Sequence, residues 1–155
     1  MQRITYCHYL YTCLCSVFAA LQLSGCAQQP PAPPVTHTDL LTRAMDALPE
    51  NQPIVIVDLP SRGAVSDRVL IQTQGGAKAD KLLRDFQHLD AIGGGAFVIY
   101  SSNPAVAKAT VLGALNKSDT CYKALNILFT GEQQHSDEVR KATQARCAHY
   151  QYLAL

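Results

Sequence analysis

Short apolar runs alternate with longer amphipathic stretches through most of this 155-residue chain. Ile54-Val55-Ile56-Val57 is a continuous β-branched run, which is typical of a strand buried on both faces. Similar apolar runs predict further strands at residues 69–73, 96–100, 125–129 and 150–155. The segments between most of these runs have helical periodicity, so the chain is predicted to alternate between strands and helices.

Helices are predicted where apolar residues recur at intervals of three and four positions. The first helix is expected to be capped by Thr38 and to end at residue 48, before the prolines that follow. The second is expected to cover residues 77–91, after Gly75-Gly76. Residues 58–67 between the first two predicted strands contain Pro60 and Gly63, and they are expected to form a loop.

Two later helices carry recognisable start signals. Ser102 or Asn103 is expected to cap the third helix, because Pro104 fits the first position after a cap. Ser136 is expected to cap the last helix, with acidic residues 137 and 138 in its first turn, where negative charge is favoured.

Strands that alternate with helices favour an α/β fold with parallel pairing. The first two predicted strands, at residues 54–57 and 69–73, are joined by a loop without a helix, which leaves that pair open to antiparallel pairing. We therefore expect a small layered α/β domain with a mixed, partly parallel sheet.

The N-terminal segment has the order of a secretory signal peptide. Arg3 is followed by an apolar stretch that ends in small residues, and Leu23-Ser24-Gly25-Cys26 closes it. These four residues resemble the lipobox of bacterial lipoproteins. In that family the cysteine thiol receives diacylglycerol, the peptide is cut before the cysteine, and the new amine is usually acylated. The resemblance therefore implies a protein that starts at Cys26 and is held on a membrane by lipid.

An uncleaved transmembrane anchor is the alternative reading of this segment. Residues 4–23 approach the ~20 residues that a spanning helix needs. However, the stretch contains His8, Gln22 and several hydroxyl residues, so it is only moderately apolar.

The resemblance also suggests a location. In Gram-negative members of the lipoprotein family, Asp after the lipidated cysteine commonly retains the protein in the inner membrane, and this chain has Ala27. We therefore expect the outer membrane, with the domain facing the periplasm. The predicted organisation is a signal peptide at residues 1–25, a Pro-rich extended tether at 26–36, and a single domain at 37–155.

Charge and composition narrow the classes of partner. The chain has 13 Lys and Arg against 12 Asp and Glu, and removal of Arg3 with the signal peptide makes the remainder neutral. A neutral domain offers no electrostatic attraction for nucleic acid or for anionic lipid headgroups. The expected partners are the membrane, through the N-terminal lipid, and other envelope proteins.

Cys121 and Cys147 are the cysteines that remain after the signal peptide and the lipid site are set aside. An even pair in an exported chain favours a disulfide, with two free buried thiols as the alternative. Each cysteine precedes a predicted strand, and one helix lies between these strands. Parallel neighbours in such a unit start at the same edge of the sheet, so the two cysteines are expected to lie close together.

The ends of the predicted strands are the best place for a ligand, because ligands of parallel sheets bind outside the carboxyl ends of the strands. The residues at these ends are small or polar: Gly75, Gly76, Ser101, Ser102, Asn103, Thr130 and Gly131. A glycine pair before a helix also exposes backbone N–H groups to an anion. Ordinary turn and cap chemistry explains the same residues, and the sequence favours that explanation.

No catalytic group is predicted, and no metal or cofactor. His135 and His149 lie near the cysteines in sequence, but their spacing matches no regular metal site and a disulfide would consume both thiols. The leading expectation is a non-enzymatic lipoprotein that docks within a cell-envelope assembly of the secretion, conjugation or pilus type. A ligand-binding or enzymatic domain using the strand-end loops is the alternative, and a surface lipoprotein for adhesion or immunity is a third.

Overall fold

The computed structural model describes residues 35–49 and 52–154, which form one compact unit beginning at Val35. A four-stranded sheet in the order β1-β2-β3-β4 lies at its centre. The strands are β1 (Ile54–Asp58), β2 (Gly95–Tyr100), β3 (Leu125–Thr130) and β4 (His149–Leu153). The predicted α/β class is confirmed, and every strand pairing within the described ranges is parallel.

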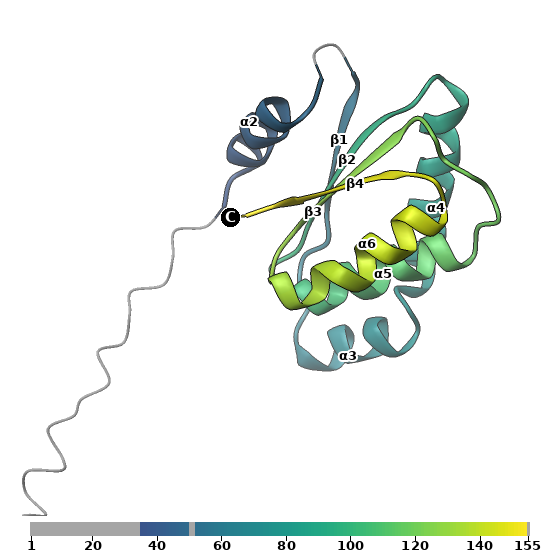
Figure 1. The fold of residues 1–155 in the computed structure, drawn as a ribbon. Helices are drawn as coiled ribbons and strands as arrows, with labels where there is room; N and C mark the ends of the chain where they lie inside the picture. Colours follow the sequence, from purple (N-terminus) through teal and green to yellow (C-terminus); the bar gives the residue numbers. More distant parts are fainter. Residues whose placement is uncertain (1–34, 50–51, 155) are drawn as a thin grey trace, which may run out of the picture. The chain divides into compact units, whose positions relative to one another are not determined.

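Helices connect successive strands and cover both faces of the sheet unequally (Figure 1). α3 (Ala64–Gln72) and α4 (Gly76–Ala91) join β1 to β2, α5 (Pro104–Asn116) joins β2 to β3, and α6 (Gln133–Ala145) joins β3 to β4. α4, α5 and α6 cover one face, whereas α2 (His37–Ala47) packs on the other.

Side-chain alternation along the strands supplies two separate hydrophobic cores. β2 contributes Phe97 and Ile99 to the larger core, beneath α4, α5 and α6. The same strand contributes Ala96 and Val98 to a smaller core beneath α2. The sheet therefore buries β2 and β3 from both sides, which holds the ends of these strands in fixed positions.

The predicted strand at residues 69–73 is wrong, because these residues lie in α3 and in the turn that follows it. Val69-Leu70-Ile71 is apolar, but a short apolar run does not by itself distinguish a strand from a helix. Gly63 at the N-cap has a φ of +93°, and Gly75 after the helix has a φ of +82°, so glycines bound this helix on both sides. Since no strand forms here, the antiparallel pair does not form either, and the loop after β1 ends at Gly63.

Two of the predicted caps are also wrong. Thr36, rather than Thr38, caps α2 and forms a reciprocal capping box with Asp39. α6 begins before Ser136, with Glu132 at its N-cap, so the acidic residues 137 and 138 lie beyond its first turn. Ser136 is instead buried and shares a 2.7 Å hydrogen bond with the hydroxyl of Tyr150 on β4. At α5 the prediction is confirmed, since Asn103 accepts a hydrogen bond from the Ala105 N–H.

β1 is not buried on both faces, contrary to the prediction from its sequence. It lies at the edge of the sheet, pairs with β2 alone among the described residues, and leaves Val55 36% exposed. Val57 packs partly against the larger core, and Ile54 and Ile56 pack partly against the smaller one, so each face of β1 is covered only in part.

Cys121 and Cys147 are joined by a disulfide, with their Cα atoms 5.1 Å apart. Cys121 precedes β3 and Cys147 precedes β4, and these two strands are parallel neighbours. The pairing thus follows the geometry expected of one strand-helix-strand unit.

The predicted signal peptide, the lipobox with Cys26 and the tether up to residue 34 lie outside the described residues. Val35 packs against the core beneath α2 and Thr36 caps that helix, so these two residues belong to the domain rather than to the tether. In the described ranges, no helix combines the length and the apolar character that crossing a membrane requires.

Candidate functional site

The predicted ligand loops are only partly brought together by the fold. Ser101, Ser102 and Asn103 follow β2, and Thr130 and Gly131 end or follow β3, at the same edge of the sheet. Gly75 and Gly76 do not lie at this edge after a strand, because they form the junction between α3 and α4.

Asp67 is the centre of a hydrogen-bond cluster at this edge, and sequence reasoning did not find it. Its carboxylate accepts from the Ser61 hydroxyl at 2.5 Å, the Arg62 backbone N–H at 3.0 Å and the Asn103 side-chain amide at 2.9 Å. The residue is only 4% exposed. The hydrogen bond from Ser61, with those from Arg62 and Asn103, lowers the pKa of Asp67 below its ordinary value.

Ser101 and Ser102 extend this cluster to the loop after β1. The Ser101 hydroxyl donates to the Leu59 carbonyl at 2.5 Å and accepts from the Asn103 backbone N–H at 3.0 Å. The Ser102 hydroxyl accepts from the Ser61 backbone N–H at 3.1 Å. The polar side chains after β2 are therefore engaged in fixing two loops, and hydrogen bonds already made inside the protein are not free for a ligand.

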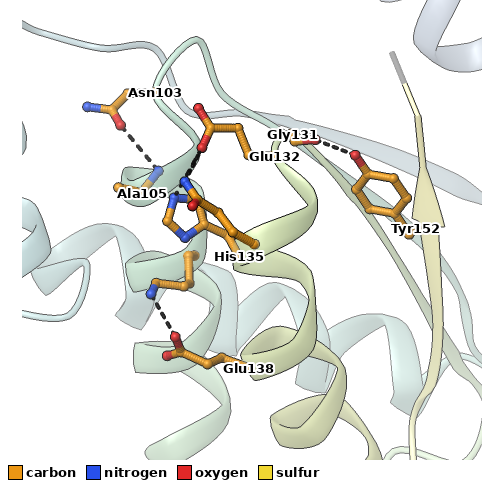
Figure 2. Close-up of polar contacts among 9 residues, drawn as sticks. Asn103, Ala105, Gly131, Glu132, His135, Glu138 and Tyr152 are labelled. Atoms are coloured by element: carbon orange, nitrogen blue, oxygen red, sulfur yellow. Dashed lines mark hydrogen bonds and ion pairs between the residues drawn. The ribbon is translucent and has the colours of Figure 1, made fainter.

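The loop after β3 is held in a similar way (Figure 2). The Thr130 hydroxyl donates to the Ile99 carbonyl at 3.0 Å, and the Tyr152 hydroxyl donates to the Gly131 carbonyl at 2.5 Å. Figure 2 also shows Glu132 turned toward His135, with 3.9 Å between carboxylate and imidazole. These contacts join β3, β4 and the start of α6, and they explain the small polar residues here as structural.

Gly75 and Gly76 are required by packing and backbone conformation. A Cβ on Gly75 would lie 2.6 Å from the Thr110 Cα on α5, and both glycines have positive φ. The glycine pair is therefore explained by the close approach of the start of α4 to α5, which only a residue without a side chain permits.

Two hollows lie beside the Asp67 cluster, along β1, α3 and α4. The first, here called the β1 groove, has a volume of about 330 Å³ and is lined by residues 55–60 and Arg62 on one side, and by four α4 residues on the other: Lys78, Lys81, Leu82 and Asp85. The second, the α3 hollow, has a volume of about 410 Å³. Its lining is Arg62, Val65, Ser66, Val69, Leu70, Ala77 and Lys78.

The two hollows share a pair of cations, Arg62 and Lys78. The Lys78 Nζ has almost no accessible surface and no hydrogen-bond partner among the described residues. The Lys78 charge nevertheless contributes to lowering the pKa of the Asp67 carboxyl, so a buried carboxylate of the domain itself lies within range of this ammonium. The signal that could have revealed this region is the pair Val65 and Val69, one helical turn apart, which point outward and are 81% and 53% exposed.

The described residues contain no group of three or more His, Cys, Asp or Glu side chains placed to hold a metal ion. Both thiols that the metal alternative would need are joined in the disulfide. Compared with protein-family models, curated proteins and solved structures, the chain shows no significant match to any of them.

Proposed function

We propose that this chain is a non-enzymatic docking component of a cell-envelope assembly. In this proposal Cys26 carries lipid, and the lipid holds the domain on the outer membrane, facing the periplasm. Support for the anchor comes from the lipobox resemblance at residues 23–26. Support for docking comes from the contrast between the two regions described above.

The docking proposal rests on a contrast between two regions of the domain. At the carboxyl ends of β2 and β3, the polar side chains are consumed by internal hydrogen bonds. On α3, Val65 and Val69 project from a surface rimmed by Arg62 and Ser66. Contiguous apolar surface with a polar rim marks interaction sites, and in this proposal it receives a partner protein.

The anchor is tested by membrane fractionation and intact mass of the protein from its native host. The expected mature mass is that of residues 26–155 plus acyl chains, less two hydrogens for the disulfide. Cys26→Ala should abolish acylation, and the protein should then leave the membrane fraction. Cys15→Ala, inside the signal peptide, should change neither acylation nor membrane association. A full-length, unacylated mass that ignores Cys26→Ala would overturn the lipoprotein proposal.

Docking is tested by photo-crosslinking in intact cells. A photoreactive amino acid replaces Val69 in one strain and Ile92 in another, because Ile92 is 64% exposed but lies at the end of α4. Docking through α3 predicts an adduct of one defined mass from position 69 and none from position 92. Equal, diffuse labelling from both positions would contradict it.

A further inference from the structure

β1 has the composition of an interior strand but the position of an edge strand. Its first four residues form a continuous β-branched run, whereas β4, at the other edge, alternates His149, Gln151 and apolar residues. Edge strands of soluble proteins are usually protected by charges, by proline or by covering elements. In β1 the run from Ile54 to Val57 has none of these charges, and Val55 remains partly exposed.

The free edge of β1 offers a regular set of backbone groups. The Pro53 carbonyl accepts from the Ala96 N–H, and the Leu59 N–H donates to the Tyr100 carbonyl, both at 2.9 Å. Since backbone groups alternate in direction along a strand, residues 53, 55, 57 and 59 face β2. The N–H and C=O groups of Ile54, Ile56 and Asp58 therefore point away from the sheet.

The β1 groove runs beside this free edge. Val55 and Val57 supply apolar lining from the strand, and Leu82 supplies it from α4. Three of its charged residues take part in ion pairs within the described chain: Lys81 with Asp85 at 2.6 Å, and Asp58 with His37 at 3.4 Å. The Lys78 ammonium is buried and acts on the Asp67 carboxyl, whereas the exposed Arg62 takes part in no ion pair with another described residue. The groove thus combines unpaired backbone, apolar surface and one exposed cation without an ion pair among the described residues, Arg62.

We propose that an extended segment of a partner protein adds to β1 as a fifth strand. Its backbone pairs with Ile54, Ile56 and Asp58, its apolar side chains lie in the β1 groove, and a carboxylate meets Arg62. This mode of recognition takes its affinity from main-chain hydrogen bonds and its selectivity from pockets for alternate side chains. The inference rests on the docking function proposed above, and it adds the surface and the chemistry of the partner.

The charges favour a different protein over a second copy of this chain. An antiparallel pair of β1 strands centred on Ile56 would place the second Asp58 opposite Ile54, at the end of the strand remote from Arg62. Arg62 would then gain no carboxylate. An acidic residue in a partner segment meets this requirement directly, since opposite charges across an interface fix register and select the partner.

The first test measures binding of synthetic peptides to the processed, lipidated protein in phosphatidylcholine nanodiscs. The probe is a dye-labelled six-residue peptide of alternating threonine and valine with one aspartate, read by fluorescence anisotropy. Arg62→Met should weaken binding at least tenfold, and so should aspartate-to-asparagine exchange in the peptide, whereas Lys141→Met on the exposed side of α6 should not. Arg62→Met changes an exposed side chain and keeps the backbone N–H that donates to Asp67, so the variant is expected to fold as stably as the wild type.

Strand addition has a signature that a merely electrostatic contact lacks. N-methylation of alternate peptide amides should abolish binding for one set of positions and leave it for the other set, because only one set faces β1. Equal effects of the two sets, equal effects of Arg62→Met and Lys141→Met, or no binding of the aspartate peptide would each overturn the proposal.

Photo-crosslinking in cells separates this inference from the proposed function. Adducts from both position 55 and position 69 with a second protein support strand addition. An adduct from position 69 alone would overturn strand addition and leave docking intact, whereas no adduct from either position would overturn docking itself. An adduct of twice the chain mass from position 55 would identify a second copy and overturn the partner assignment.

Discussion

The side-chain amide of Asn103 donates a 2.9 Å hydrogen bond to the carboxylate of Asp67, although the two residues are 36 positions apart. Asn103 simultaneously caps α5, through its side-chain oxygen and the Ala105 N–H at 3.2 Å. One side chain thus positions the start of α5 and ties it to α3, at the edge of the sheet where α/β proteins commonly bind ligands.

Asn103→Ala is therefore expected to lower the free energy of unfolding by about 1–2 kcal/mol, because it removes a helix cap together with a hydrogen bond to a carboxylate. Denaturant titration of the purified protein measures the loss. Asn103→Ser retains a capping oxygen but lacks the amide donor, so it should recover part of the stability. A loss below about 0.5 kcal/mol for Asn103→Ala would contradict the structural role assigned here.

Asp67 predicts a specific dependence of stability on pH. Hydrogen bonds from Ser61, Arg62 and Asn103 lower its pKa in the folded state below the ordinary value. A lowered pKa means that the stabilisation is fully present above the unfolded value, near 4, and is lost as the pH falls through the folded value.

The measurement for Asp67 compares the wild type with Asp67→Asn between pH 7 and pH 2.5. The variant should be less stable at pH 7, and the difference between the two proteins should shrink below pH 4. Other carboxylates titrate in both proteins, so their contribution cancels in the difference. A difference in the free energy of unfolding that stays constant across this range would show that the charge of Asp67 does not stabilise the fold.

Replacement of both Cys121 and Cys147 by serine is expected to lower the free energy of unfolding by about 3 kcal/mol, since the disulfide closes a loop of 26 residues. Both cysteines lie at exposed positions, so serine is accommodated without burying a new polar group. Urea unfolding of the variant, beside wild type with and without reductant, measures the effect. Reduced wild type should resemble the double variant, and a reduced protein as stable as the oxidised one would contradict the prediction.

Gly113→Ala is expected to destabilise the protein by about 1–3 kcal/mol, although alanine is ordinarily the better helix former. A Cβ at this position of α5 would lie 1.8 Å from the Gln74 carbonyl oxygen, so α3 and α4 would have to shift. Thermal unfolding measures the change, with Gln144→Ala on the exposed surface of α6 as a control. A variant as stable as the wild type would show that the α3–α4 junction does not approach α5 this closely.

The candidate site illustrates how far local sequence signals reach. Ser101, Asn103 and Thr130 were expected at the ends of parallel strands, and the structure places them there. Asp67 was missed because it lies between two predicted elements, and nothing in its neighbours reveals an amide donor 36 residues later. Gly75 does not lie at the end of a strand as predicted, because the apolar segment before it belongs to α3.

The sequence by itself determined the alternation of strands and helices, the α/β class and the cysteine pair, because each depends on periodicity or on short-range connectivity. Only the tertiary structure decided that β1 lies at an edge, that residues 69–72 are helical, and that the strand-end hydroxyls are engaged within the protein. The physical reason is that an apolar run records a tendency to be buried without recording the surface that buries it. For β1 that surface is incomplete within the described chain, and this is the basis for expecting a partner strand.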